Sequence, residues 1–272
     1  MKMKLSFSTL GCPDWDLSEV VAVAADLGYN GIEIRGVGEE IYAPRVRELL
    51  PEHAGELLEK LRAAKLTIPI LTSGAYLANN PDIAAAEAEV KDYVNLAARL
   101  GVPYVRVLGE GTPEPGGKVD KDDVIARFKS LCEYAENFGV TLLVETNGWL
   151  AGSNHMLDFI KRVCMPNAGV LWDVHHTVRF FGERPAATVE RLGRYIKHVH
   201  VKDSVQKPDG KIMYVLTGYG DIPIEDAYKA LSAIGYEGFY SYEWVKRWAR
   251  ELDEPGVAFY KYISYMRGIE GD

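Results

Sequence analysis

The chain has 272 residues, of which 47% are hydrophobic and 26% are charged, and both fractions are close to the averages for soluble globular proteins. This composition disfavours disordered, fibrous and membrane classes, and no apolar run approaches the roughly 18 residues needed to span a bilayer. The formal net charge of -8 disfavours nonspecific binding to nucleic acid, because proteins recognise phosphates with basic patches.

Short β-branched runs alternate along the chain with longer stretches of helical periodicity, which is the pattern of parallel βαβ units. The predicted strands are Leu5–Ser8, Gly31–Ile34, Thr67–Leu71, Tyr104–Val107, Thr141–Glu145, Gly169–Asp173, His198–Val201 and Phe239–Tyr242. Divided among eight units, 272 residues leave 34 residues for each. We therefore expect an α/β chain whose residues 1–272 form a single (β/α)₈ TIM barrel domain.

The segments between the strands support this division. Residues 82–100 are rich in Ala, Glu and Leu and predict a helix with one apolar face. Glycine-containing turns precede several strands, as expected where a helix ends and the chain turns into the next strand. The segment 109–117 reads as a flexible loop, either closing over a site or idle. Two doubly wound domains are the alternative, but no G-x-G-x-x-G opens a helix after a strand.

Polar residues close four consecutive predicted strands. They are Glu145, Asp173, either His198 or His200, and Glu243. Alternation along the seventh strand puts both histidines on the same face, so the pattern alone does not choose between them. The carboxyl ends of barrel strands meet at one face, where three carboxylates and an imidazole would repel each other unless a cation compensated them. This ligand set suits one divalent ion, Mn²⁺, Mg²⁺, Co²⁺ or Zn²⁺. Alternatively, each acid caps the following helix or pairs with a surface lysine, a reading that gives no reason for the pattern across four strands.

Several motifs around these residues are similar to those of a known family. They are Phe7-Ser8-Thr9-Leu10-Gly11-Cys12-Pro13-Asp14-Trp15, Gly28-Tyr29-Asn30-Gly31-Ile32-Glu33-Ile34-Arg35, Val144-Glu145-Thr146-Asn147, Trp172-Asp173-Val174-His175-His176, His198-Val199-His200-Val201-Lys202-Asp203, Gly218-Tyr219-Gly220-Asp221 and Gly235-Tyr236-Glu237-Gly238. Along nearly its whole length the chain resembles the xylose isomerase-like TIM-barrel superfamily, especially its sugar phosphate isomerase/epimerase branch.

The resemblance implies roles for individual residues. It makes Glu145, Asp173, His200 and Glu243 the metal ligands and His176 a contact for substrate oxygens. It also implies that Glu145 and Glu243 exchange a proton on opposite faces of a keto-sugar through an enediolate, with the metal as Lewis acid. The expected activity is a metal-dependent, for example manganese-dependent, isomerase or epimerase of carbohydrate metabolism.

Two basic residues are further candidates for substrate binding. Lys202 alternates with His200 along its strand and could meet a phosphate or carboxylate, and Arg106 lies on the fourth strand. A solvated loop position is the alternative for both. His175 and His198 read as structural or supporting histidines. Trp15, Trp149 and Trp244 lie beside strand ends, where they could stack on a sugar or serve packing alone.

Three other functions compete with this prediction. A metal-dependent dehydratase of the inosose or dehydroshikimate type could use the same residues. Endonuclease IV-type repair enzymes resemble one another in extra histidines after strands three and four, which this sequence lacks. A non-catalytic sugar-binding barrel would need no acid pair. The partner expected is a small carbohydrate, with no nucleic acid and no membrane, and the oligomeric state, including a homo-oligomer, stays open.

Cysteine usage bears on the cellular compartment. Cys12, Cys132 and Cys164 are odd in number and widely spaced, with no C-x-x-C pair for a structural zinc or redox centre. The N-terminal Met-Lys-Met-Lys leads directly into a strand-like segment and shows no export signal. We therefore expect a reduced cytoplasmic protein.

Overall fold

The computed structural model describes residues 3–271. Its contacts divide these residues into two compact units, which are described one at a time. Unit 1 contains the described residues up to Pro69 and from His200 onward, and unit 2 contains Ile70–Val199. The strand β7 (Ile196–Val201) begins in unit 2 and ends in unit 1.

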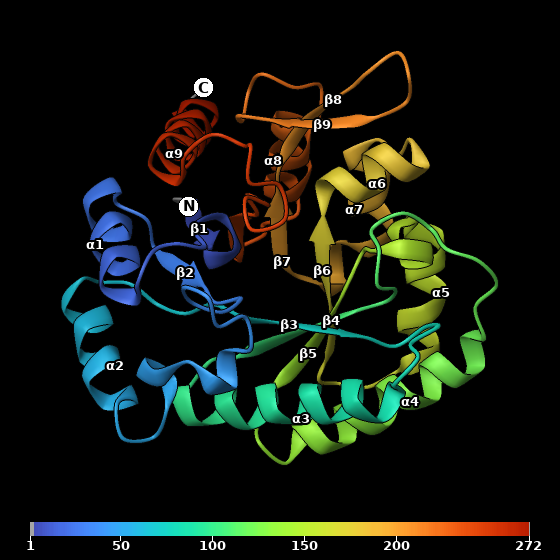
Figure 1. The fold of residues 1–272 in the computed structure, drawn as a ribbon. Helices are drawn as coiled ribbons and strands as arrows, with labels where there is room; N and C mark the ends of the chain where they lie inside the picture. Colours follow the sequence, from blue (N-terminus) through green and yellow to red (C-terminus); the bar gives the residue numbers. More distant parts are fainter. Residues whose placement is uncertain (1–2, 272) are drawn as a thin grey trace. The chain divides into compact units, whose positions relative to one another are not determined.

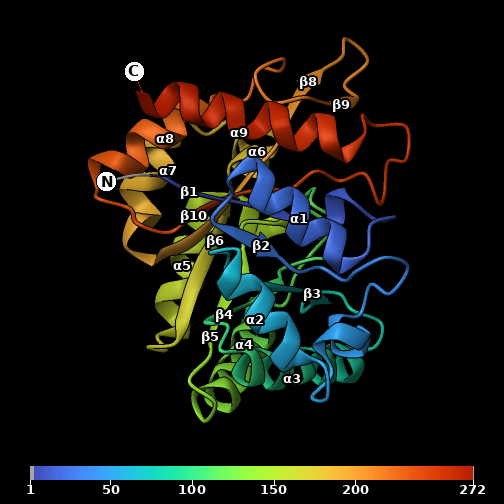
Figure 2. The same cartoon turned by 90° about the vertical axis from the view of Figure 1, so that its left-hand side faces the viewer.

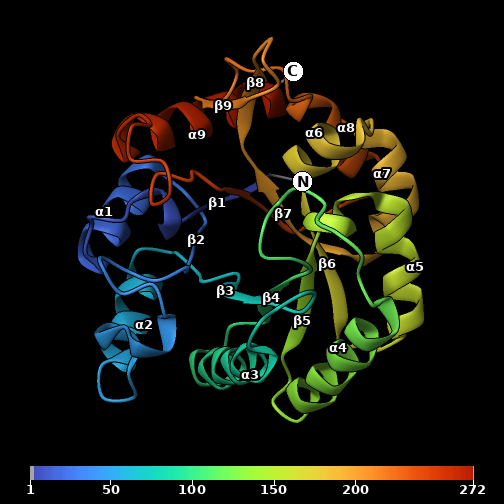
Figure 3. The same ribbon diagram turned by 45° about the vertical axis from the view of Figure 1, so that its right-hand side comes forward.

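Unit 2 is built from parallel strands backed by helices. Its strand order is β7-β6-β5-β4-β3, with β3 (Leu71–Tyr76), β4 (Tyr104–Leu108), β5 (Thr141–Glu145) and β6 (Ala168–Asp173) paired in parallel. The helices are α3 (Ile83–Leu100), α4 (Lys121–Glu136), α5 (Ser153–Val163), α6 (Val174–Phe181) and α7 (Pro185–Leu192), with 3₁₀ turns η4 (Gly148–Ala151) and η5 (Gly193–Tyr195). Helices α3 and α4 run along one side of these strands (Figure 1), and α5 lies beside both α4 and α7 (Figure 3).

Unit 1 has the strand order β2-β1-β10-β7, with β1 (Lys4–Ser8) parallel to both β2 (Gly31–Glu33) and β10 (Phe239–Tyr242). Its helices are α1 (Leu17–Leu27), α2 (Ala54–Ala63), α8 (Ile224–Ala233) and α9 (Pro255–Gly271), with 3₁₀ turns η1 (Thr9–Gly11), η2 (Ala43–Arg45) and η3 (Arg47–Leu49). Helices α1 and α9 lie side by side (Figure 2). An antiparallel hairpin, β8 (Asp203–Gln206) and β9 (Ile212–Val215), follows β7.

Aromatic packing forms much of the interior of unit 1. The Phe7 ring on β1 stacks on Phe259 of α9 with centroids 4.0 Å apart, and Tyr242 on β10 stacks on Tyr262 at 4.6 Å. All four side chains are fully buried. Aromatic pairs of this kind add about 0.5–1.5 kcal/mol each beyond their buried area. Strands β1 and β10 are therefore held firmly against α9.

Most of the predicted strands are confirmed with small shifts of their ends, but the third is misplaced. Residues Leu71–Tyr76 form β3, whereas Thr67 makes only an isolated parallel bridge to Gly31. Pro69 interrupts the predicted run, and proline has no N–H to donate to a ladder. The predicted helix 82–100 is confirmed from Ile83, with the Asp82 side chain accepting the Ala85 N–H as N-cap. Its end is the left-handed Gly101 at φ 68°. The β8–β9 hairpin was not predicted.

Side-chain hydrogen bonds connect the segment 109–117 to the residues that follow β5. The buried Glu110 carboxylate accepts hydrogen bonds from the backbone N–H groups of Trp149, at 2.5 Å, and Gly116, at 3.1 Å. The Asn147 side chain accepts the Glu110 N–H at 3.0 Å and donates to the Thr112 carbonyl at 3.1 Å. These contacts tie the segment to the turn after β5.

A buried lysine organises the segment between β10 and α9. Lys246 is only 5% exposed, and its ammonium group donates to the carbonyls of Leu252 at 2.6 Å and Arg250 at 3.3 Å. It also pairs with Glu254 at 3.0 Å. The three N–H donors of this ammonium group thus serve two backbone carbonyls and one carboxylate along a segment that has no regular secondary structure.

Replacing Lys246 with methionine should therefore lower the free energy of unfolding by about 1–3 kcal/mol, because the two carbonyls lose their donor. Urea denaturation followed by circular dichroism measures the change. Lys229→Met on the exposed face of α8, where the side chain is 66% exposed, is the matched control and should change stability by no more than about 0.5 kcal/mol. Equal stability of both variants would show that Lys246 does not hold the segment.

Within residues 3–271, no helix combines the length and apolar character needed to cross a membrane.

Candidate functional site

The candidate site in unit 2 begins with a carboxylate at the end of each of two paired strands. Glu145 is the last residue of β5 and Asp173 the last residue of β6, and both are almost completely buried. Arg106 on β4 pairs with Glu145, its Nη1 lying 3.0 Å from Oε2. The same guanidinium donates from Nη2 to the Ser73 carbonyl at 2.7 Å. Arg106 is thus held between β3 and β5, with its charge compensating Glu145.

Asp173 is also the N-cap of α6. Capping of the following helix was one of the alternative roles predicted for these acids. Its Oδ1 accepts the His176 N–H at 3.0 Å, while Oδ2 lies 3.5 Å from the Nε2 atom of His176. The Nδ1 atom of His176 lies 3.0 Å from the Thr146 carbonyl, which can only accept, so Nδ1 carries the proton. In the neutral ring, Nε2 then faces Asp173 with its lone pair. Two acceptors facing each other favour a cation or a second proton at this place.

Two more features of unit 2 bear on metal binding. His175, which is fully buried, offers a ligand atom within 4.8 Å of those of Asp173 and His176. The Nδ1 atom of His176 also lies 3.4 Å from the Glu145 Oε1 atom. Unit 2 therefore gathers Arg106, Glu145, Asp173 and His176 of the predicted residues into one buried cluster, which we call cluster A.

Unit 1 carries a second buried cluster, cluster B, arranged as a chain of alternating groups. His200 on β7 places Nε2 2.9 Å from the Glu33 Oε2 atom and Nδ1 3.3 Å from the Glu243 Oε1 atom. Lys202 then places Nζ 2.5 Å from the Glu243 Oε2 atom. All four side chains are at most 8% exposed. Cluster B thus brings together His200, Lys202 and Glu243 of the predicted residues.

Glu33 is the member of cluster B that sequence reasoning missed. It ends the buried strand β2, and its exposed fraction is 0%. The rule that selected Glu145, an acid at the end of an apolar strand, would have selected Glu33 as well. The predicted strand Gly31–Ile34 ran one residue too far, so Glu33 stood inside it rather than at its end.

The environment of His200 changes its proton affinity. Complete burial by itself lowers the pKa of an imidazole, but the negative charges of Glu33 and Glu243 on either side outweigh this effect. The result is a pKa well above the usual value for histidine.

The charges of the two clusters are similar. Cluster A has two carboxylates, Glu145 and Asp173, and one cation, Arg106. Cluster B has two carboxylates, Glu33 and Glu243, and one cation, Lys202. With neutral histidines, each set of named residues carries 1 − 2 = −1. The protein thus compensates part of its buried acid charge itself and leaves a deficit that a cation can fill.

Other motif residues hold the chain rather than add to these clusters. The buried Asp203 carboxylate accepts the backbone N–H groups of Gly218 and Gly220, both at 2.9 Å, and that of Ile222 at 3.3 Å. A Cβ atom at Gly220 would lie 2.0 Å from the Asp203 Oδ1 atom. The Gly-Tyr-Gly-Asp motif is therefore shaped to wrap around Asp203.

The three tryptophans named as candidates pack against other aromatic rings, whereas His198 offers a ligand atom within 4.8 Å of those of Glu33 and His200 in cluster B. Trp244 is fully buried and stacks on Tyr242, with centroids 5.6 Å apart, so it packs the interior of unit 1. Trp149 is 7% exposed and packs edge-on against Phe159 at 6.0 Å. Trp15 lies edge-on to Phe259 at 5.7 Å, and His198 is buried in β7. Packing accounts for the positions of all three tryptophans.

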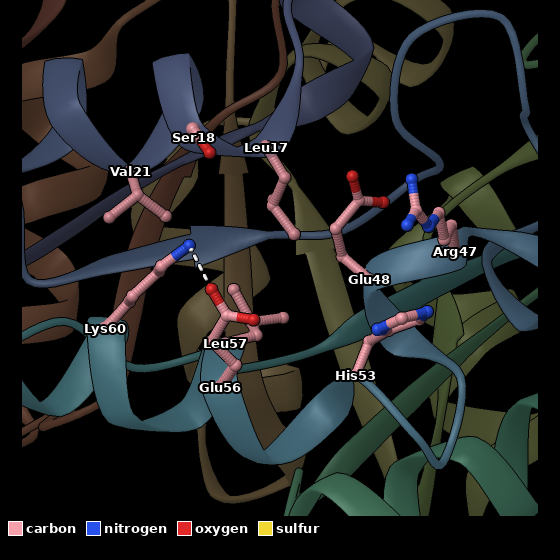
Figure 4. Close-up of a pocket in the computed structure, with 9 residues that line it drawn as sticks. All are labelled: Leu17, Ser18, Val21, Arg47, Glu48, His53, Glu56, Leu57 and Lys60. Atoms are coloured by element: carbon pink, nitrogen blue, oxygen red, sulfur yellow. Dashed lines mark ion pairs between the residues drawn. The ribbon is translucent and has the colours of Figure 1, made fainter.

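A surface pocket in unit 1 lies among α1, η3 and α2 (Figure 4). It is lined by Leu17, Ser18, Val21, Arg47, Glu48, His53, Glu56, Leu57 and Lys60, of which Glu56 and Lys60 form an ion pair at 2.8 Å. None of these nine residues belongs to either cluster. Its charges are of both signs, and Arg47, Glu56 and Lys60 are exposed, so the pocket has no evident chemistry.

Comparison with known proteins places these observations in context. Residues 21–262 match the family model described as xylose isomerase-like TIM barrel. Fructoselysine 3-epimerase of Shigella flexneri is 23% identical over 270 residues, covering 92% of each sequence.

Two solved structures share this fold, and they belong to proteins with different names. The probable 3-DHS dehydratase AsbF from Bacillus anthracis superimposes with a TM-score of 0.79 at 17% identity, covering 97% of this chain and 99% of that chain. The IolI protein, solved with a bound zinc atom, superimposes with a TM-score of 0.77 at 20% identity, covering 96% of both chains. At these identities the structures establish the shared fold.

Proposed function

Because the chain belongs to the xylose isomerase-like TIM barrel family, we propose that it is a divalent-metal-dependent sugar epimerase or isomerase working as one domain. The reaction we propose is transfer of a proton at the carbon next to the carbonyl of a keto-sugar, through an enediolate. The similarity to a curated fructoselysine 3-epimerase supports a carbohydrate substrate and this reaction class. The free cysteines Cys12, Cys132 and Cys164 accord with a cytoplasmic location.

Glu145, Asp173, His200 and Glu243 would hold one divalent ion. The donor set fits, because it combines carboxylate oxygens with an imidazole nitrogen, as Mn²⁺, Mg²⁺, Co²⁺ and Zn²⁺ all accept. The charge also fits, since clusters A and B are each short of one positive charge, as counted above. When bound, such an ion polarises a carbonyl oxygen and stabilises negative charge that develops on it.

Glu145 and Glu243 are the groups we propose for proton transfer, and their settings are alike. In each, Oε2 contacts a buried cation, Arg106 for Glu145 and Lys202 for Glu243. In each, Oε1 faces the Nδ1 atom of a histidine, at 3.4 Å for His176 and 3.3 Å for His200. One glutamate would take the proton from carbon and the other would return one, which is general acid–base catalysis by positioned groups.

The matched setting of the two glutamates carries this proposal. Buried carboxylates cost several kcal/mol each unless compensated, and each of these two lies between a buried cation and a histidine ring, which suits groups that exchange a proton with a bound sugar. We propose His176 as a contact for substrate oxygens, whereas the contacts of Arg106 and Lys202 support positioning roles better than direct substrate binding.

Metal analysis followed by proton exchange tests the proposal. The purified protein is analysed for metal content, then incubated in D₂O with a panel of keto-sugars, with and without chelator. We expect about one metal ion per chain and deuterium incorporation next to the carbonyl that chelator abolishes. A protein that binds no added divalent metal and catalyses no exchange would instead be a non-catalytic sugar-binding barrel.

A metal-dependent dehydratase is the second candidate, and the structural match to a probable dehydratase favours its inclusion. It would begin with the same proton abstraction but then expel a hydroxyl group. Mass spectrometry of the products separates the two, because dehydration removes the mass of one water whereas epimerisation in D₂O adds deuterium. The endonuclease alternative still lacks its histidines, since none lies in or directly after β3 or β4.

A further inference from the structure

Glu33 is a buried carboxylate with a specific partner that the proposed reaction does not use. It ends β2, where its backbone is paired with Ser8 of β1, and its exposed fraction is 0%. Its Oε2 atom lies 2.9 Å from the Nε2 atom of His200, whose exposed fraction is also 0%. An acid on the second strand is thereby fixed against a ring on the seventh.

The chemistry of the two groups decides which nitrogen of His200 carries the proton. Both carboxylates beside the ring only accept hydrogen bonds, but the contact with Glu33, at 2.9 Å, is shorter than that with Glu243, at 3.3 Å. Nε2 is therefore the nitrogen that keeps its proton when a metal supplies the positive charge on the Glu243 side. In the neutral imidazole the other nitrogen, Nδ1, then carries the lone pair of the ring. That nitrogen is directed to Glu243, with its Oε1 atom 3.3 Å away. The ring therefore presents a lone pair on the side of one proposed ligand and a proton on the side of Glu33.

We infer that Glu33 is a positioning residue that holds His200 in the Nε2–H form, so that Nδ1 is the atom that binds the metal. The inference rests on the proposed function, in which His200 is a ligand. Carboxylates behind ligating histidines fix both ring orientation and tautomer, and they raise the basicity of the ligating nitrogen. A glutamine at position 33 has no negative charge and could reverse its amide to donate to Nε2, which would favour the opposite form.

Zinc affinity of the purified protein tests this role. Zn²⁺ is titrated into metal-free wild type, Glu33→Gln and Glu183→Gln in competition with a chromophoric chelator. Glu183 is the matched control, because it too is largely buried at 13% exposure and accepts hydrogen bonds, from the Ser153 N–H at 2.9 Å and the Thr188 hydroxyl at 2.8 Å. We expect Glu33→Gln to bind Zn²⁺ about 10–100-fold more weakly and Glu183→Gln to match wild type.

The outcomes separate the inference from the proposed function. If wild type binds Zn²⁺ and Glu33→Gln binds it equally well, the positioning role is wrong and the metal site stands. If wild type binds no Zn²⁺, the proposed metal-dependent function is wrong, and the inference about Glu33 that rests on it is wrong as well.

A measurement on the wild type covers the case in which Glu33→Gln does not fold. Long-range ¹H–¹⁵N spectra of the zinc-loaded protein distinguish a protonated from a metal-bound ring nitrogen. For His200 we expect a proton on Nε2 and zinc on Nδ1. Zinc on Nε2 would overturn the inference whatever the variant does.

Discussion

Replacing Glu243 with glutamine should abolish turnover and leave the fold intact. Glutamine has nearly the same shape and can still accept a hydrogen bond from Lys202, which contacts Glu243 at 2.5 Å, but it cannot take or return a proton. Loss of a positioned acid–base group typically costs about 10²–10⁴-fold in rate. Weakened metal binding would add to this loss, because Glu243 is also a proposed ligand.

Deuterium exchange into the keto-sugar that wild type turns over measures the effect, with circular dichroism to verify folding. Metal content of the variant, measured at saturating metal, separates lost proton transfer from lost metal. Glu237→Gln is the control, since Glu237 is an exposed acid six residues earlier, outside both clusters, and should keep full activity. Full activity of Glu243→Gln would remove Glu243 from the mechanism.

Replacing Arg106 with methionine should destabilise the protein by about 3–5 kcal/mol, because it removes one partner of a buried ion pair. Arg106 and Glu145 have side-chain exposures of 7% and 2%, so solvent screens their interaction little. The variant leaves the Glu145 charge buried without this cation and also removes the donor to the Ser73 carbonyl. Urea denaturation of the metal-free protein measures the loss.

Companion variants separate charge from packing. The double variant Arg106→Met with Glu145→Gln should recover much of the lost stability, since no uncompensated charge from the pair remains. Arg106→Lys should fall between, because lysine keeps the charge but not the two-pronged geometry that reaches both Glu145 and Ser73. A loss below about 1 kcal/mol in Arg106→Met would contradict the positioning role and favour direct contact with substrate.

The sequence alone was a good guide wherever a feature depended on a few neighbouring residues. Apolar runs that end in an acid or histidine located β5, β6, β7 and β10, and the Asp82 cap with Gly101 bounded α3 to within one residue. The prediction was poorer at β3, because the predicted strand Thr67–Leu71 contains Pro69 and the observed strand begins at Leu71 and ends at Tyr76. Alternation of apolar and polar residues depends only on positions close together in the chain, so it can be recognised in the sequence without knowledge of the fold.

The partners of these side chains were decided by tertiary structure. The sequence does not indicate that Glu33 contacts a ring 167 residues away, or that Arg106 compensates Glu145 across 39 residues. Nor does it show that Glu110 and Asn147 tie down the segment 109–117. Such pairings depend on strand register and on which rotamers fit a packed interior, and both are set by contacts far apart in the chain. The sequence determined which groups could do chemistry, and the fold decided which of them hold the others in place.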